Sequence, residues 1–274
     1  MENKTNFIRP AAVAGMFYPS DATELRETIA RYLNKVNQGI APADKTMVKA
    51  IIVPHAGYIY SGPIAASAYA HILPRREKIR RVILLGPSHR VPVSGIAASH
   101  AAEFQTPLGN IPLDLESIDK IVSLPQVTYM DIAHQMEHSL EVHLPFLQIV
   151  LKDFTLVPLV VGEASAEEVA EVLELLWGGE ETLIVISSDL SHYHNYFEAQ
   201  QLDERTSIAI ESLEPEKIHY EDACGRTPVN GLLKLAKKFG ARISTVDLRN
   251  SGDTAGDKDR VVGYGAYILN EATH

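Results

Sequence analysis

Five short runs of aliphatic residues limit the folds that are open to this chain. They lie at 48–53, 81–85, 154–161, 183–186 and 261–269, and they are rich in Val, Ile and Leu. Near-continuous apolar runs of this length are typical of strands that helices cover on both faces. The pattern therefore predicts an α/β fold with a central sheet, mostly parallel or mixed, flanked by helices.

Helical patterns lie between these runs. Apolar residues recur at three- and four-residue intervals in six segments, at 63–72, 115–123, 139–151, 166–177, 197–213 and 229–239. Ser165 and Glu168 form a capping-box pattern at the start of one helix, and Gly240 marks the end of another. Because no stretch has the composition of a linker, we predict one domain over residues 1–274.

Charge and cysteine content narrow the classes of partner and compartment. The net charge of −10 disfavours binding to nucleic acid or to anionic membranes, since both need clustered Lys and Arg. The basic run at 75–81 is a local exception, which we interpret as a solvated turn before a strand. A single cysteine excludes an intramolecular disulfide, and no signal pattern or membrane-spanning run is present, so we expect a cytoplasmic protein.

Three of the predicted strands lead into a short polar segment that ends in histidine. The first, second and fourth runs are followed by His55, His89 and His192. The carboxyl ends of parallel strands line the ligand crevice of open α/β sheets, so these side chains are expected to converge. Imidazole commonly binds Fe, Cu and Zn and transfers protons near neutral pH. Each histidine alone fits a hydrogen-bonded loop residue, but the three together favour a shared site.

A second cluster, at 134–143, is dense in histidine and glutamate. If this segment is helical, its side chains three and four residues apart meet on one face. The order of residues is not that of a zinc-protease motif, in which a glutamate follows the first of two histidines. We therefore predict that His138, Glu141 and His143 support the ligands of a site through hydrogen bonds rather than binding a metal directly.

The single cysteine, Cys224, precedes the helical pattern that opens near Pro228. A thiol near a helix N-terminus and close to Arg226 should have increased thiolate character, which suits metal binding or nucleophilic attack. An inert buried cysteine is the alternative. Arg226 is expected either to clamp an anionic ligand or to pair with the nearby Glu221 or Asp222.

Five ordered motifs carry a resemblance to a known family. They are Pro54-His55-Ala56-Gly57-Tyr58-Ile59-Tyr60-Ser61-Gly62, Leu85-Gly86-Pro87-Ser88-His89, Glu137-His138-Ser139-Leu140-Glu141-Val142-His143-Leu144-Pro145, Ser187-Ser188-Asp189-Leu190-Ser191-His192 and Cys224-Gly225-Arg226. Together they resemble the Memo family, whose bacterial and archaeal members are also called AmmeMemoRadiSam system protein B. The resemblance begins at Arg9 and reaches the last predicted strand, so it covers nearly the whole chain.

The resemblance implies a fold similar to that of class III extradiol dioxygenases. Those enzymes cleave catechol-type rings with non-haem Fe(II) held by two histidines and a glutamate. By this resemblance, His55, His89 and Cys224 occupy the ligand positions, and His192 matches the histidine that acts as acid and base. Further positions that match the pocket are Asp189, Tyr60 and Phe17.

A cysteine where the dioxygenases have a glutamate changes the expected chemistry. Thiolate is a softer ligand than carboxylate, so it shifts the preference toward copper or zinc, and it is itself oxidisable. Ring cleavage is therefore not carried over with the fold. The leading expectation is a redox-active Fe(II) or copper protein, with zinc as a further option, that acts as an oxidoreductase on a small molecule. His192 and Asp189 would be catalytic, and Arg226 would position an anionic substrate.

Two other functions stay open at this point. The first is a binding module that holds an anionic peptide or metabolite in the same cleft without turnover. The second is thiol or hydrolytic catalysis by a dyad of Cys224 and His192. The bacterial family name also implies a functional link to a radical-SAM protein.

Overall fold

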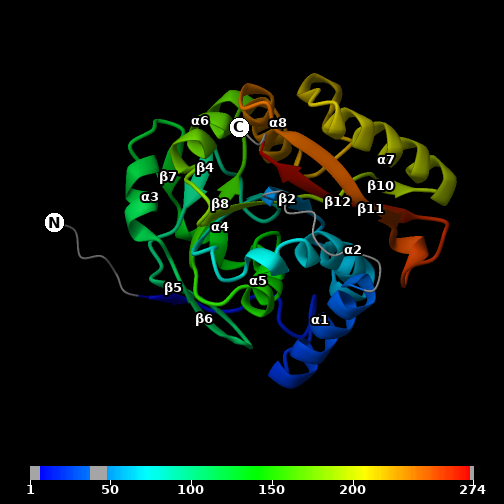
Figure 1. The fold of residues 1–274 in the computed structure, drawn as a ribbon, viewed down its shortest axis with the longest axis horizontal. Helices are drawn as coiled ribbons and strands as arrows, with labels where there is room; N and C mark the ends of the chain where they lie inside the picture. The colour runs from blue at the N-terminus through cyan, green and yellow to red at the C-terminus, as the bar shows by residue number, and fades with distance from the viewer. Residues whose placement is uncertain (1–6, 38–47, 272–274) are drawn as a thin grey trace.

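A mixed sheet organises the chain in the computed structural model, which describes residues 7–37 and 48–271. The strands of this sheet are β2 (Val48–Val53), β3 (Arg81–Pro87), β4 (Ile96–Ala98), β7 (Val127–Tyr129), β8 (Thr155–Val161), β9 (Thr182–Ser187), β10 (His192–His194), β11 (Arg242–Asn250) and β12 (Val261–Asn270). Their order is β10-β12-β2-β9-β3-β8-β4-β7, and β11 pairs with β12 outside that path. Figure 1 shows β4 and β7 towards one side of the molecule and β10, β11 and β12 towards the other. The predicted fold class, α/β with a mixed sheet flanked by helices, is confirmed.

The four central strands run parallel to one another. β9 lies between β2 and β3, and β8 lies beyond β3. Every residue of β2 and β9 is buried, as the continuous apolar runs predict for strands covered on both faces. β12 runs antiparallel to β2, and β4 runs antiparallel to β8. The carboxyl ends of the four parallel strands therefore lie together at one end of the sheet.

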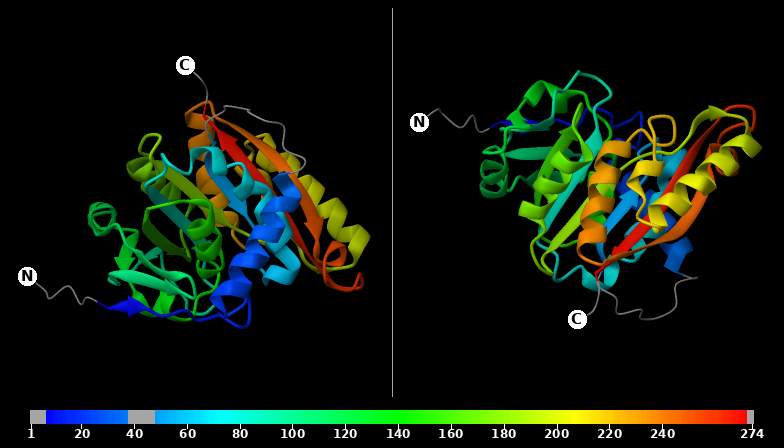
Figure 2. Two further views of the ribbon diagram at one scale, coloured as in Figure 1. Left: turned by 60° about the horizontal axis from the view of Figure 1, so that its bottom comes forward. Right: turned by 90° about the horizontal axis from the view of Figure 1, so that it is seen from above.

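Helices cover both faces of the sheet (Figure 2). On one side lie α1 (Ala22–Asn37), α2 (Tyr58–Ala70) and α5 (Leu144–Val150), and on the other lie α6 (Ala166–Leu176), α7 (Tyr196–Glu211) and α8 (Arg226–Lys238). A small second sheet contains β1 (Ile8–Arg9), β5 (Glu103–Thr106) and β6 (Gly109–Pro112), and two short helices, α3 (Leu115–Ile121) and α4 (Asp131–Gln135), complete this end of the molecule. None of the helices in the described ranges is both long enough and apolar enough to cross a bilayer.

Helix ends follow the predicted signals. The Ser165 side chain accepts the backbone N–H of Glu168, and the Glu168 carboxylate accepts the backbone N–H of Ser165, which is the expected capping box. α8 ends at Lys238, and Gly240 follows with a φ of +64°, a conformation that glycine adopts without strain.

The helix predicted at 139–151 begins later in the structure, at Leu144. α4 ends at Gln135, a loop follows, and a single turn of 3₁₀ helix (Glu141–His143) leads into α5. The loop forms because the Glu137 carboxylate takes the backbone N–H groups of His138 and Ser139, which a continuous helix would bond to main-chain carbonyls. Pro145, which lacks an N–H, sits in the first turn of α5, where none is needed.

Candidate metal centre

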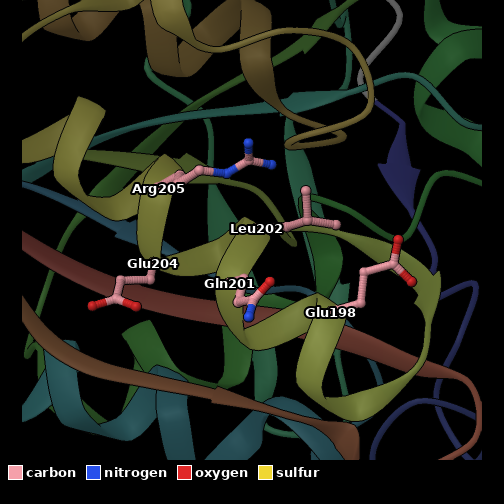
Figure 3. A pocket seen from close by; sticks show the side chains of 5 residues that line it. All are labelled: Glu198, Gln201, Leu202, Glu204 and Arg205. Atoms are coloured by element: carbon pink, nitrogen blue, oxygen red, sulfur yellow. The ribbon is translucent and has the colours of Figure 1, made fainter.

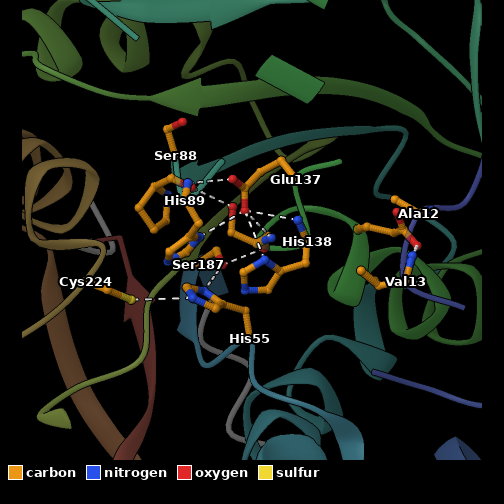
Figure 4. Close-up of polar contacts among 12 residues, drawn as sticks. Ala12, Val13, His55, Ser88, His89, Glu137, His138, Ser187 and Cys224 are labelled. Atoms are coloured by element: carbon orange, nitrogen blue, oxygen red, sulfur yellow. Dashed lines mark hydrogen bonds and ion pairs between the residues drawn. The ribbon is translucent and has the colours of Figure 1, made fainter. Parts of the chain in front are cut away.

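Three imidazoles converge at the carboxyl ends of the central strands (Figure 4). His55 follows β2, His89 follows β3, and His138 lies in the loop after α4. One ring nitrogen of each lies within 4.8 Å of the others. Within the described ranges, these three form the group of ligand-type side chains close enough to hold one ion. The convergence of His55 with His89 was predicted, whereas His138 was expected behind the ligands and lies among them instead.

Two of the three imidazoles, those of His55 and His138, are held in the neutral form that binds metals. Burial, together with the neighbouring imidazoles, lowers the pKa of His55 well below its ordinary value. Burial likewise lowers the pKa of His138 to about 4, although the nearby Glu137 charge opposes this shift. Both rings therefore offer a nitrogen lone pair at neutral pH.

Glu137 connects His89 to the loop that carries His138. One carboxylate oxygen accepts the backbone N–H of His89 at 2.6 Å. The other lies 3.0 Å from His89 Nδ1 and accepts the backbone N–H groups of His138 and Ser139 at 3.0 and 2.9 Å. Burial opposes ionisation, but the hydrogen bonds and electrostatic attraction of His89 and the hydrogen bond from Ser139 outweigh it, so the pKa of Glu137 falls to about 2.

Ser187, the last residue of β9, connects His55 to another imidazole, that of His143. Its Oγ lies 2.6 Å from His55 Nδ1 and 3.0 Å from His143 Nε2, and it donates to the Ser139 carbonyl at 2.7 Å. Burial lowers the pKa of His143 to about 3. His143 is therefore joined to His55 through one hydroxyl.

Cys224 adjoins the three imidazoles but lies outside their group. Its sulfur is 3.4 Å from His55 Nε2 and accepts the backbone N–H of Asp189 at 3.3 Å. Burial raises the pKa of the thiol, and the Asp189 charge adds to the rise. The expected gain in thiolate character is therefore wrong for the metal-free chain, because desolvation outweighs the helix terminus. The guanidinium of Arg226 lies over the Tyr220 ring, 5.5 Å from its centroid.

Asp189 and His192 lie at the same end of the sheet. Asp189 accepts the backbone N–H of His55 at 2.7 Å, and its second oxygen is 4.0 Å from His55 Nε2. Burial raises the pKa of Asp189 to about 7, against the effect of backbone hydrogen bonds. His192 begins β10, and burial lowers its pKa. Its imidazole is also among the groups that lower the pKa of His55.

The remaining predicted site residues are Phe17, Tyr60 and Glu141, and they differ in what they contact. The Phe17 ring lies 4.7 Å from the His138 ring, and the Phe17 carbonyl accepts the backbone N–H of Tyr58 at 2.7 Å. Tyr60 is half-buried. After burial, Asp189 and Tyr60 both contribute to the raised pKa of Tyr264. Glu141 faces away from the imidazoles toward the N-terminal segment, where its carboxylate accepts hydrogen bonds from Arg9, Ala12, Val13 and Tyr18.

A surface hollow elsewhere contains none of these side chains. It is lined by residues of α7, namely Glu198, Gln201, Leu202, Glu204 and Arg205 (Figure 3). All five come from one helix, and no imidazole or thiol is among them. We therefore locate the candidate site at the imidazole group.

Glu137 and Ser187 were not predicted as site residues, although both lie in the motifs that carry the resemblance. Ser187 offered one usable signal, because it is a hydroxyl residue at the end of an otherwise apolar run that leads toward His192. Glu137 offered less, since nothing in its spacing shows that it faces His89, which lies 48 residues earlier in the chain.

The whole chain is similar to proteins of one known family. The Memo-like protein family matches residues 9–268. A MEMO1 family protein of Aquifex aeolicus is 39% identical over 268 residues, with 94% of this chain and 97% of that protein covered. A MEMO1 family protein of Methanosarcina mazei is 34% identical, with 96% and 99% covered.

A solved structure shares the fold at low sequence identity. The crystal structure of an uncharacterized protein from Escherichia coli K12 aligns with a TM-score of 0.50 at 12% identity and covers 81% of this chain and 99% of its own. This likeness concerns the fold alone. Since the family match spans nearly the whole chain and relatives above 30% identity cover almost all of it, the chain belongs to the Memo family.

Proposed function

We propose that this protein binds a redox-active metal ion, non-haem iron or copper, at His55, His89 and His138, and acts on a small molecule bound beside the ion. The observation that carries the proposal is the approach of three imidazole nitrogens to within 4.8 Å of one another. Imidazole suits Fe, Cu and Zn alike, so the donor set favours these metals over Mg²⁺ or Ca²⁺.

The residues fit such an ion in two further respects. His138 Nδ1 is buried and, among the described residues, has no hydrogen-bond partner, which is costly unless another group uses it. The Cys224 sulfur lies 3.4 Å from His55 Nε2, and two ligand atoms of one tetrahedral ion are separated by about 3.5 Å. Cys224 is therefore proposed as a further ligand beside His55, as the family resemblance implies.

The bound metal would supply electron transfer to or from the substrate. The chain's own residues would hold and move protons around it. His192, neutral because burial lowers its pKa, is proposed to accept a proton from the substrate. Asp189 holds the His55 backbone through its hydrogen bond, and Phe17 packs against His138, so both restrict the positions of the ligand rings.

Metal content tests the proposal directly. We expect the full chain, purified without oxygen, to retain about one iron or copper ion per molecule by mass spectrometry. Replacing any one of the three histidines removes a ligand, so His55→Ala and His138→Ala should each weaken binding at least tenfold. Cys224→Ala should lower affinity for Cu(I) more than for Zn(II), because thiolate is the soft ligand.

A matched control separates ligand loss from general damage. His100 is an exposed imidazole paired with Asp131 at 2.9 Å, outside the group, so His100→Ala should leave metal binding unchanged. If the wild-type chain retains no metal and binds no iron, copper or zinc in titration, the proposal is wrong.

One observation favours a second candidate, a binding module for an anionic peptide or metabolite. Arg90 is exposed beside His89, and its charge reaches His138. Arg226 lies two residues after Cys224 in the chain. In the same calorimeter, metal-free protein that binds inorganic phosphate and no metal would favour this module.

A further inference from the structure

Ser187 has one proton to share among three partners. The Ser139 carbonyl can only accept, so the hydroxyl proton of Ser187 goes to it, over 2.7 Å. The Ser187 oxygen must then accept from both of its imidazole neighbours, His55 Nδ1 at 2.6 Å and His143 Nε2 at 3.0 Å. His55 therefore carries its proton on Nδ1.

Glu137 leads to the same result for His89. Three backbone N–H groups, those of His89, His138 and Ser139, point at its carboxylate and can only donate. The oxygen that receives two of them also lies 3.0 Å from His89 Nδ1. An oxygen in this setting acts as an acceptor, so His89 also carries its proton on Nδ1.

We infer that Ser187 and Glu137 are positioning residues that set His55 and His89 in the Nδ1-protonated tautomer before a metal arrives. In that tautomer both Nε2 lone pairs are available to one ion. The purpose of the arrangement rests on the proposed metal-binding function, whereas the tautomers themselves are a property of the metal-free chain. Two ligands are thus preset by hydrogen bonds, one to β9 and one to the loop after α4.

His138 provides an internal comparison. Its Nδ1 is buried, lies 3.4 Å from Glu137 Oε1 and makes no hydrogen bond among the described residues. That oxygen already serves His89 and the backbone of His138 and Ser139. No hydrogen bond within residues 7–37 and 48–271 sets the tautomer of His138 through its Nδ1, so it is the adaptable ligand of the three.

Nitrogen NMR of the metal-free full chain tests the inference. With ¹⁵N-labelled histidine, long-range ¹H–¹⁵N spectra distinguish the two neutral tautomers of each ring, and single histidine variants assign the signals. We expect the Nδ1-protonated pattern alone for His55 and His89, and a mixture for His138. Either of the first two rings in the Nε2-protonated form would overturn the inference.

Variants at the end of β9 sharpen the test. Ser187→Ala removes the acceptor, so His55 should become a mixture while His89 keeps its pattern, and zinc affinity should fall by about 10- to 100-fold. Ser187→Thr keeps the hydroxyl and should restore both. Ser188→Ala is the matched control for the His55 NMR pattern, because this neighbouring buried hydroxyl bonds the Asp189 carbonyl and the Gly225 N–H and neither imidazole.

The outcomes separate this inference from the proposed function. An unchanged His55 pattern in folded Ser187→Ala would contradict it. Should Ser187→Ala fail to fold, the wild-type spectrum decides by itself. If the wild-type chain shows both preset tautomers yet binds no zinc, iron or copper, the tautomer assignment stands and the metal-binding proposal falls.

Discussion

Individual buried side chains hold the loops of this site by serving several partners at once. Asp203, on α7, is 2% exposed, and its Oδ1 accepts the backbone N–H of Ser191, the residue before His192. A Cβ on Gly263 would lie 2.0 Å from Asp203 Oδ2, so only glycine allows this approach. Burial raises the pKa of Asp203 to about 6, against its hydrogen bonds to Ser191.

Asp203→Asn should change the pH dependence of stability. In the unfolded chain Asp203 ionises near pH 4, whereas the folded chain keeps the proton to about pH 6. The folded state therefore binds more protons in this window, and this group lowers the free energy of unfolding as pH rises from about 4 to about 6. We expect the variant's slope of unfolding free energy against pH to be more positive, by up to about 1.4 kcal/mol per unit. Urea denaturation at several pH values measures it, and equal slopes would contradict the prediction.

At the scale of elements, the site depends on close approach between the loops that follow the strands. Gly225 precedes α8 and donates its N–H to Ser188 Oγ at 2.9 Å. A Cβ there would lie 2.4 Å from the Ser187 carbonyl oxygen. Gly86, near the end of β3, meets the Ser139 side chain in the same way, with 2.8 Å from a Cβ to its Oγ. The loops carrying Cys224 and His138 can therefore pack on the strand ends only where a side chain is missing.

Gly225→Ala should destabilise the fold and displace Cys224. The added methyl overlaps backbone, which cannot move aside as a side chain can, so we expect a loss of about 1–3 kcal/mol in the free energy of unfolding. Chemical denaturation measures the loss. Gly57→Ala is the matched control, since a Cβ at Gly57 meets nothing closer than 3.6 Å and its φ is −57°. Equal stability of the two variants would show that the loop yields.

At the scale of the whole molecule, a buried ion pair ties the small sheet to the site. Arg9, in β1, pairs with Glu141, and both side chains are almost fully buried. Arg9 also donates to the His134 carbonyl at 3.0 Å and to the Glu137 carbonyl at 2.8 Å. The N-terminal segment thereby holds both ends of the loop that presents His138.

Glu141→Ala should be strongly destabilising. It leaves the Arg9 guanidinium buried without its partner charge, and breaking such a pair costs about 3–5 kcal/mol. Thermal and urea denaturation of the metal-free protein would detect a loss of this size. Glu116→Ala removes the partner of Lys120 from an exposed pair and should leave stability unchanged within error. A Glu141→Ala variant as stable as wild type would mean that the pair does not hold the loop.

The elements that were predicted correctly are those with a strong local signal. The runs that became β2, β3, β8 and β9, and the capping box of α6, are readable because burial on both faces and helix capping are local requirements. α1, β11 and the small sheet were not predicted. β11 and the strands of the small sheet are half-exposed or very short, so periodicity alone does not distinguish them from loops. α1 does have a helical period, with Leu25, Ile29 and Leu33 buried, and was missed despite it.

The site was predicted in part, for a related reason. His55 and His89 share a position after a buried strand, and parallel strands bring their carboxyl ends together. His138 arrives through a loop whose path depends on Glu137 facing His89, a contact between residues 48 apart in the chain. Spacing within the 134–143 segment left a helix open, and the structure has a loop after Gln135 instead, held by that long-range carboxylate contact.

The amino-acid sequence by itself determined the layered α/β architecture, the strand ends that carry two of the imidazoles, and the family. Each of these depends on local pattern or on motifs in a set order. The tertiary structure alone decided that His138 joins His55 and His89, that Cys224 lies beside the group with a thiol pKa raised by desolvation, and that Ser187 and Glu137 hold the rings. These facts depend on distances between segments far apart in the chain, and desolvation acts on a side chain only after folding has buried it.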